Sequence, residues 1–278
     1  MLVVEGDIDP SGLRAVESLI ASGVCASADY CQTTESTNTQ ALSDLRHGLI
    51  DQTLLPKCYL TDQQTAGRGR HGRRWMSDRG TLTFSLVLDR AAIDRRRSQL
   101  LSIAVGVGIA RVIEFEFAPL QAKLKWPNDV HIGGGKVAGV LLENIADSPQ
   151  QVVVGVGVNV ATEPSVEPGQ AGFITRSLAQ VVGRDVRRYE IFSPLVSGIM
   201  EAIVELRDSA DELIDELIDE FRNRCLLSGQ KISFQQRGKE CQGICCGISS
   251  SGELMVETDA GTQFVQSGEA RLVRVAKD

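Results

Sequence analysis

The run Val152–Val158 constrains the fold of this chain more than any other stretch. Its sequence, Val-Val-Val-Gly-Val-Gly-Val, is almost wholly apolar. A strand with one face in water would instead alternate apolar and polar residues. We therefore expect Gln151–Val160 to form a central strand of a sheet that is covered on both faces. The chain can enclose such a sheet, because it has 278 residues and 42% of them are hydrophobic.

The segments before and after this strand predict a sheet flanked by helices. Apolar spacing indicates further strands at Lys57–Thr61, Thr81–Leu88 and Lys136–Asn144. Helices are expected at Ser11–Ala21, Thr39–His47, Gln99–Phe117 and over much of 188–226. Ser36 or Thr37 is a candidate N-cap of the second helix. Residues 1–30 are expected to contain little structure besides the first helix.

The pattern changes after Gly229. Short strands separated by glycine-containing turns are expected at 231–234, 241–248, 253–257, 262–265 and 271–275. About fifty residues of this kind suggest a small β-barrel. The sequence thus predicts a short N-terminal extension over 1–30, a main domain over 31–227 and a barrel over 228–278.

Composition excludes several classes of protein. The formal net charge is −7, so a general nucleic-acid-binding surface is not expected. No stretch approaches the roughly 18 apolar residues of a membrane span, and the first residues lack the features of a signal peptide. Seven cysteines in a chain of this length do not indicate a disulfide framework. A reduced, cytoplasmic protein is the expectation.

The segment Gly67–Trp75, here called the arginine loop, carries the strongest chemical signal. Its sequence is Gly-Arg-Gly-Arg-His-Gly-Arg-Arg-Trp. Glycine allows close approach to a ligand, arginine binds phosphate and carboxylate oxygens in a fork, and tryptophan offers a face for stacking. The loop is expected to be flexible and to close over an anion that carries a planar ring. A solvated basic loop is the plainer alternative, with His71 on its surface.

Two further clusters accompany the loop. Lys125–Asp129, Lys-Trp-Pro-Asn-Asp, places an amide and a carboxylate just after a strand, and Lys136 enters a strand from a glycine turn. The lysine segment lacks the hydroxyl residue of a Walker A loop, because Val137 follows the lysine. The glycines of the 152–158 run do not form a dinucleotide fingerprint, since a third glycine is missing. Trp126 is expected to be core packing.

Together these elements resemble, in order and spacing, the biotin protein ligases. The resemblance runs from about residue 33 to 160 and includes Ser36-Thr37-Asn38, Gln64, the arginine loop, Lys125–Asp129, Lys136–Gly139 and Val154–Asn159. It implies an α+β fold, with a mixed β-sheet flanked by helices as in class II aminoacyl-tRNA synthetases. Residues 31–227 would be the catalytic biotin- and ATP-binding domain, and 228–278 an SH3-like β-barrel.

The resemblance implies a two-step reaction. Biotin and ATP, with Mg²⁺, would form biotinyl-5′-adenylate, and a lysine of the biotin carboxyl-carrier domain of a carboxylase would then accept the biotin. Cationic groups suit this chemistry, because negative charge develops on phosphate and carbonyl oxygens in both steps. A loop that closes would protect the adenylate from water.

The resemblance also assigns roles to residues. Those implied to bind biotin are Ser36, Thr37, Asn38, Gln64, Gly67, Arg68, Gly69, Arg70, Lys136 and Gly139. Those implied to bind ATP or the adenylate are Arg70, Arg73, Trp75, Asn128, Lys136 and Asn159. The catalytic set is Lys136, Arg70 and Asp129, with Asp129 orienting Mg²⁺ or the carrier lysine. Ser36–Asn38 could instead be a helix cap alone.

A metal site built from a protein cluster is not expected. Cys245 and Cys246 would point to opposite faces of a strand, and no histidine follows His131. These cysteines, with Cys225 and Cys241, are expected to be core residues. Mg²⁺ would arrive with ATP.

Two other functions stay open from the sequence. One is a lipoate or octanoate ligase or transferase on the same fold, and the other is a biotin-sensing regulator that binds DNA. Only 35 residues precede Ser36, which is short for an N-terminal DNA-binding domain, so a monofunctional ligase with no nucleic-acid or membrane partner is expected. The oligomeric state is open, with a homodimer as one candidate.

Overall fold

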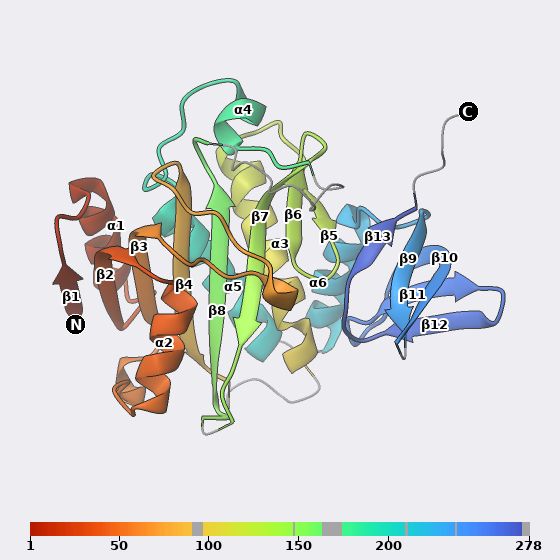
Figure 1. Ribbon diagram of the computed structural model, residues 1–278, viewed down its shortest axis with the longest axis horizontal. Coiled ribbons are helices and arrows are strands. Elements are labelled where there is room, and N and C mark those ends of the chain that lie inside the picture. Colours follow the sequence, from red (N-terminus) through yellow and green to blue (C-terminus); the bar gives the residue numbers. More distant parts are fainter. Residues whose placement is uncertain (91–96, 147, 163–173, 209–210, 237, 274–278) are drawn as a thin grey trace.

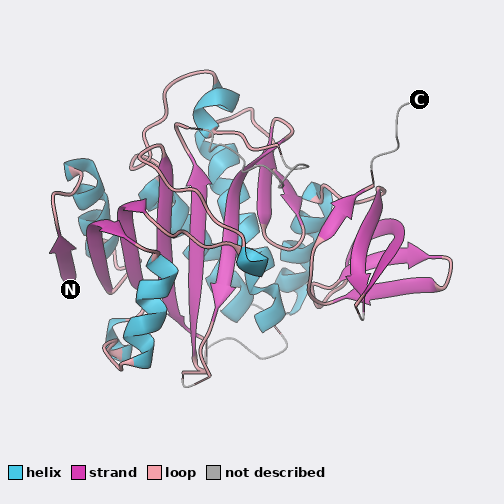
Figure 2. Cartoon of the chain, in the orientation of Figure 1, coloured by secondary structure: helices cyan, strands magenta, loops and turns pink. Residues whose placement is uncertain are grey.

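The computed structural model describes residues 1–90, 97–146, 148–162, 174–208, 211–236 and 238–273. The chain forms a large mixed sheet with helices and, beside it, a small sheet built from the C-terminal residues (Figures 1 and 2). Residues 274 and 275, the end of the last strand expected from the sequence, lie outside the described ranges.

The large sheet has eight strands in the order β1-β2-β3-β4-β8-β7-β6-β5. Their bounds are β1 Leu2–Glu5, β2 Ser27–Thr34, β3 Lys57–Gln64, β4 Thr81–Asp89, β5 Lys123–Lys125, β6 Asp129–Ile132, β7 Gly135–Glu143 and β8 Gln151–Asn159. The first three strands are parallel and the other neighbours antiparallel. Strand β8 is buried along its whole length between β4 and β7, which confirms the expectation from its apolar run.

The expectation of little structure in residues 1–30 is wrong. Strands β1 and β2 extend the sheet there, and the boundary expected at residue 30 falls inside β2. The sequence of β2, Ser-Ala-Asp-Tyr-Cys-Gln-Thr-Thr, is too polar to be recognised as a buried strand. Its Asp29 is accommodated by an ion pair with Lys57 of β3 at 2.8 Å. Strand β5 is the strand expected just before the Trp126–Asp129 turn, whereas the short strand β6 is not predicted by the sequence.

Helices cover both faces of the sheet. Helices α1 Pro10–Ala21, α3 Leu101–Glu116, α5 Phe192–Asp208 and α6 Asp211–Arg224 enclose the main core on one face. Helix α2 Thr37–Arg46 packs on the other face against Tyr59, Val87 and Val153, and the short α4 spans Leu178–Val182. Gly108 of α3 allows close helix packing, because a β-carbon there would lie 2.6 Å from the carbonyl of Gly198 in α5. Within the described residues, no helix is long and apolar enough to cross a bilayer.

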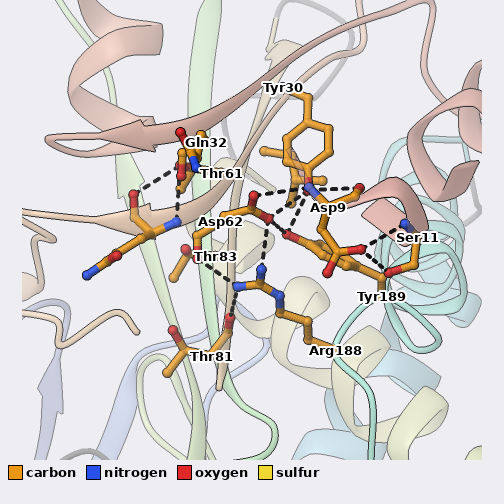
Figure 3. A network of polar contacts seen from close by, with 12 residues as sticks. Asp9, Ser11, Tyr30, Gln32, Thr61, Asp62, Thr81, Thr83, Arg188 and Tyr189 are labelled. Carbon is orange, nitrogen blue, oxygen red and sulfur yellow. Dashed lines mark hydrogen bonds and ion pairs between the residues drawn. The ribbon is translucent and has the colours of Figure 1, made fainter. Parts of the chain in front are cut away.

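A buried polar network ties the N-terminal helix to the sheet (Figure 3). Asp62 of β3 accepts hydrogen bonds from the hydroxyls of Tyr30 and Tyr189 and pairs with Arg188 at 2.8 Å. Its second oxygen accepts from the backbone of Asp9, the N-cap of α1. The carboxylate therefore fixes α1, β2, β3 and the entry to α5 at one point.

The C-terminal residues form a five-stranded antiparallel sheet in the order β12-β11-β10-β9-β13. The strands are β9 Lys231–Gln236, β10 Lys239–Ile248, β11 Leu254–Thr258, β12 Gly261–Val265 and β13 Ala270–Leu272. Each corresponds to a strand expected from the sequence. Trp126 is buried, as expected, and its indole donates to the carbonyl of Gly252 at 3.0 Å, which joins this sheet to the larger one. Cys245 is buried but Cys246 is exposed, so the expectation of a core position is wrong for Cys246, which the strand's alternation turns outward.

Candidate active site

A cavity lies between the arginine loop, the large sheet and the turn that leads into β13. The chain between β3 and β4, orange in Figure 1, crosses the front of the sheet and forms its outer wall. Of the site residues expected from the sequence, the cavity gathers Ser36, Thr37, Asn38, Gln64, Arg68, Gly69, Arg70, Arg73, Trp75, Asn128, Asp129, Lys136, Gly139 and Asn159. Gly67 lies outside this lining, beneath the carbonyl of Trp75. Their roles toward ligands stay predictions.

The arginine loop is folded as a small hairpin. Gly69 donates to the carbonyl of Arg73 at 2.8 Å, and Trp75 donates to the carbonyl of Gly67 at 2.9 Å. At the tip, exposed His71 has φ 56° and Gly72 has φ 72°, a left-handed turn for which glycine is suited. The loop therefore has its own backbone hydrogen bonds in this conformation.

Two glycines of β8 make room for the cavity's side chains. A β-carbon on Gly157 would lie 2.3 Å from Cε2 of Trp75, and one on Gly155 would lie 2.2 Å from Oδ1 of Asn38. No side chain fits at either distance, so the indole and the amide rest directly on the strand backbone. The glycines that fail as a dinucleotide fingerprint thus serve as packing surfaces.

The N-terminus of α2 forms one end of the cavity. Ser36 caps the helix by accepting from the backbone of Thr39. The backbone N–H of Thr37 donates to Oε1 of Gln64 at 2.9 Å, and Asn38 donates to Oε2 of Glu143 at 2.9 Å. All three residues are buried and hydrogen-bonded, so they act as a helix cap and as cavity lining at once.

The arginines of the loop bind different partners. Arg68 pairs with Glu143 of β7 at 2.5 Å, Arg70 donates to Oδ1 of Asn128 at 3.3 Å, and Arg73 forms an ion pair with Glu269 beside β13. Burial lowers the pKa of Arg70 from its ordinary value. Burial alone would raise the pKa of Glu269, but hydrogen bonds from Arg73 and Arg271 outweigh it and hold that pKa at about 2. Glu269 is therefore ionised and brings the C-terminal sheet to the cavity.

Lys136 lies at the centre of the cavity's charge. Its Nζ is 2.6 Å from Oδ1 of Asp129 and 5.5 Å from the centroid of the Trp75 ring. Gly139 leaves space for the ammonium, because a β-carbon there would lie 2.8 Å from Nζ. Burial would raise the pKa of Asp129, but the neighbouring ammonium of Lys136 outweighs it, and the pKa is lower than usual. The pair is thus an ion pair whose cation faces the indole.

The two asparagines of the site donate hydrogen bonds to backbone carbonyls. Asn128 donates to the carbonyl of Val140 at 2.6 Å, and Asn159 donates to the carbonyls of Lys136 and Arg176 at 3.3 and 3.2 Å. Among the described residues, Oδ1 of Asn159 and Nε1 of Trp75 are buried without a hydrogen-bond partner. A ligand can satisfy such groups.

Among the residues at or beside the cavity that sequence reasoning missed are Ser85, Lys125, Glu143 and Glu269. Lys125 is buried in the cavity wall, and burial lowers its pKa. It stands in the Lys-Trp-Pro-Asn-Asp cluster, where its charge in an otherwise buried segment was an available signal. Glu143 and Glu269 come from strand ends far from the loop, and nothing in the local sequence distinguishes them.

Comparison with known proteins places this architecture in a defined class. A model of the biotin/lipoate A/B protein ligase family matches residues 30–159. The biotin–[acetyl-CoA-carboxylase] ligase of Paracoccus denitrificans is 32% identical over 242 residues, covering 85% of this chain and 96% of that protein. The corresponding ligase of Mycobacterium tuberculosis is 30% identical, covering 94% of each chain. The chain belongs to the biotin protein ligase family.

Two further relatives extend the comparison. The bifunctional ligase/repressor BirA of Bacillus subtilis is 29% identical over 220 residues, and the match spans 77% of this chain but only 65% of that protein. The structure of the Aquifex aeolicus biotin protein ligase in complex with biotin and ATP has a TM-score of 0.74 at 26% identity, covering 89% of this chain and 99% of that one. The fold expected from the resemblance, a mixed sheet flanked by helices, is thus confirmed.

Proposed function

We propose that this chain is an ATP-dependent biotin protein ligase, which forms biotinyl-5′-adenylate and transfers biotin to a lysine of a biotin carboxyl-carrier domain. The observation that carries the proposal is the convergence of Lys136, Arg70 and Trp75 on one cavity beside the buried cap of α2. Two cations and an aromatic face suit an acyl-adenylate, and a recessed polar end suits the ring of biotin.

In the first step, a carboxylate oxygen of biotin bonds to the α-phosphorus of ATP. The bond from that phosphorus to the bridging oxygen breaks, and pyrophosphate leaves with the electron pair. Lys136 faces this junction and stabilises the negative charge that develops on it, while Arg70, held by Asn128, supplies a second cation. Trp75 offers its ring to adenine.

In the second step, the amine nitrogen of the carrier lysine bonds to the carbonyl carbon of the adenylate. The bond from that carbon to the phosphate oxygen breaks, AMP leaves with the electron pair, and the proton lost by the amine passes to solvent water. Asp129 is a weak base, because its pKa is lowered and it is paired with Lys136. We assign it to orienting the ammonium of Lys136 rather than to removing the proton.

The described residues do not fit a metal site held by the protein. Within them, no group of three or more histidine, cysteine, aspartate or glutamate side chains could hold a metal ion. The two carboxylates that line the cavity, Asp129 and Glu269, are already paired with Lys136 and Arg73. We therefore derive no step through a metal, and Mg²⁺ stays a prediction as the ion that accompanies ATP.

The wider organisation follows from the same proposal. Residues 31–227 form the catalytic domain, of the class II synthetase type, to which residues 1–30 add β1, α1 and the first part of β2. Residues 228–278 form an SH3-like barrel that contributes Glu269 to the cavity. A biotin carboxyl-carrier protein is the proposed partner, the cytoplasm the proposed location, and a homodimer one candidate assembly.

The test is transfer of biotin to a purified carrier domain in the presence of ATP. We expect transfer by the wild type and a loss of at least a hundredfold in Lys136→Ala, since one charge-stabilising donor is worth about 10²–10³ in rate. The matched control is Lys239→Ala, because Lys239 is an exposed residue of β10. This variant should transfer biotin at the wild-type rate. Transfer of lipoate or octanoate in place of biotin would refute the proposal.

A further inference from the structure

Glu143 contacts two parts of the site that are far apart in the sequence. It lies at the end of β7, and its side chain is 19% exposed. Its Oε1 lies 2.5 Å from Nη2 of Arg68 in the arginine loop, and its Oε2 accepts from Nδ2 of Asn38 in α2 at 2.9 Å. One carboxylate therefore holds both the loop and the helix cap.

The contacts continue from Asn38 into the cavity. Ser85 of β4 is buried, and its Oγ lies 2.6 Å from Oδ1 of Asn38 and 2.7 Å from Oγ1 of Thr37. Thr37 in turn donates its backbone N–H to Gln64. A continuous chain of hydrogen bonds thus runs from Gln64 through Thr37, Ser85, Asn38 and Glu143 to Arg68.

The orientation of the Asn38 amide in this chain is fixed. The Nδ2 atom of Asn38 faces two acceptors, Glu143 and the carbonyl of Leu141, so its Oδ1 must face Ser85. Because Oδ1 can only accept, the single proton of Ser85 points to Asn38. The hydroxyl proton of Thr37 then has two acceptors in reach, Oγ of Ser85 at 2.7 Å and Oε1 of Gln64 at 3.2 Å. Glu143 is the closer of the two acceptors of Asn38, at 2.9 Å against 3.3 Å for the carbonyl of Leu141, and the only one of the two that also contacts Arg68.

We propose that Glu143 is a positioning residue that holds the arginine loop against the cap of α2 and couples occupancy of the biotin pocket to the order of the loop. The coupling rests on the proposed function, since Thr37 and Gln64 are the residues to which biotin is assigned. The holding of the loop rests on the geometry alone. A ligand that fixes Thr37 and Gln64 fixes Asn38 through Ser85, and Glu143 passes that restraint to Arg68.

The substitution Glu143→Gln tests the carboxylate without changing its shape. Arg68 and Asn38 both donate to residue 143, and a glutamine has one acceptor oxygen for the two. Its amide nitrogen would face a donor, so one of the two contacts is lost. Arg68→Gln removes the same ion pair from the other side, and Arg68 is exposed enough to be replaced without unfolding the chain.

The loop carries its own reporter, because trypsin cleaves after arginine. The rate of cleavage after Arg73 and Arg74, followed by mass spectrometry, measures how often the loop opens. Without ligand, we expect Glu143→Gln and Arg68→Gln each to raise this rate about fivefold, and the double variant no further than either single one. Glu257→Gln, an exposed glutamate on β11, is the control and should cleave at the wild-type rate.

Adding biotin tests the coupling to the biotin pocket separately from the holding of the loop. Saturating biotin should slow cleavage of the wild-type loop at least fivefold and that of Glu143→Gln less than twofold. Equal protection of both proteins overturns the coupling, and ligand-free rates equal to wild type in both single variants overturn the holding of the loop. If the chain does not bind biotin, neither protein is protected, which refutes the proposed function while the ligand-free difference remains.

Discussion

The indole of Trp75 rests on the backbone of Gly157, so closely that a β-carbon on the glycine would lie 2.3 Å from the ring. Gly157→Ala should therefore displace the indole, because a rigid ring cannot give way as a flexible side chain can. We expect the KM for ATP to rise about tenfold, the order of a lost aromatic stacking contact, with little change in the KM for biotin. Steady-state kinetics of carrier biotinylation measure both.

Gly155→Ala is the matched comparison, because it adds the same methyl group two residues away on the same strand. There the methyl would meet Asn38 at 2.2 Å. The KM for biotin should rise and that for ATP should stay near the wild-type value. The same pattern of KM changes in both variants would contradict the assignment of the two ends of the cavity.

Asp129 is predicted to act through Lys136, which it holds at 2.6 Å. Asp129→Asn keeps the shape of the side chain but removes the charge that orients the ammonium. We expect the rate of adenylate formation in a single turnover to fall about tenfold, a smaller loss than in Lys136→Ala, because the cation remains but is less well placed. An Asp129→Asn variant that forms the adenylate normally but transfers it slowly would instead assign Asp129 to the carrier lysine.

The network around Asp62 is predicted to stabilise the fold rather than to take part in the reaction. Asp62→Asn would leave Arg188 without its charged partner in a position where both side chains are about nine-tenths buried. Unfolding by urea should show a loss of about 3 kcal/mol, since breaking a buried ion pair leaves an uncompensated charge. Asp208→Asn breaks an exposed ion pair with Arg207 and should cause no measurable change.

Stability is predicted to fall in mild acid because of His131. Burial lowers the pKa of His131 to about 4, whereas an unfolded histidine titrates near 6.5. Between these values the unfolded chain binds more protons, so lowering the pH favours unfolding, and below about pH 4 the effect is complete. About 2 kcal/mol of this contribution should be lost between pH 7 and pH 5.

Comparing the wild type with a variant that lacks the histidine isolates the contribution of His131 to the pH dependence of stability. Urea unfolding of the wild type and of His131→Asn at both pH values cancels the carboxylates that also titrate there. The variant should lose about 2 kcal/mol less than the wild type over this interval. Equal losses would show that His131 is protonated as easily in the folded protein as in the unfolded one.

Much of the fold could be predicted because its pattern is local. The apolar run of β8, the stripe that ends in Leu206 of α5 and the glycine turns after Gly229 are all visible within a few residues. Strand β2 could not be found this way, because Asp29 and Tyr30 are made compatible with burial by Lys57 and Asp62, which lie elsewhere in the chain. Local polarity is a poor guide where the partner is distant.

The same division applies to the site. The arginine loop and Lys136 stand in dense motifs, and the cavity gathers them. Glu143 and Glu269 are single acids at strand ends, and only the folded chain brings them to Arg68 and Arg73. They neutralise the positive charge of two arginines in the arginine loop, and residues with this role stand in no recognisable sequence motif.

The contact between Thr37 and Gln64 has a consequence for selectivity. Because Oε1 of Gln64 faces both the backbone N–H and the hydroxyl of Thr37, at 2.9 and 3.2 Å, its amide is turned so that the N–H groups are left to offer a ligand. A ring that carries a carbonyl oxygen, such as the ureido ring of biotin, would accept hydrogen bonds from those N–H groups. The dithiolane ring of lipoate offers only sulfur, a weak acceptor, and would leave them unpaired. The direction of one amide would thereby separate two cofactors of similar size that are built on a common fold.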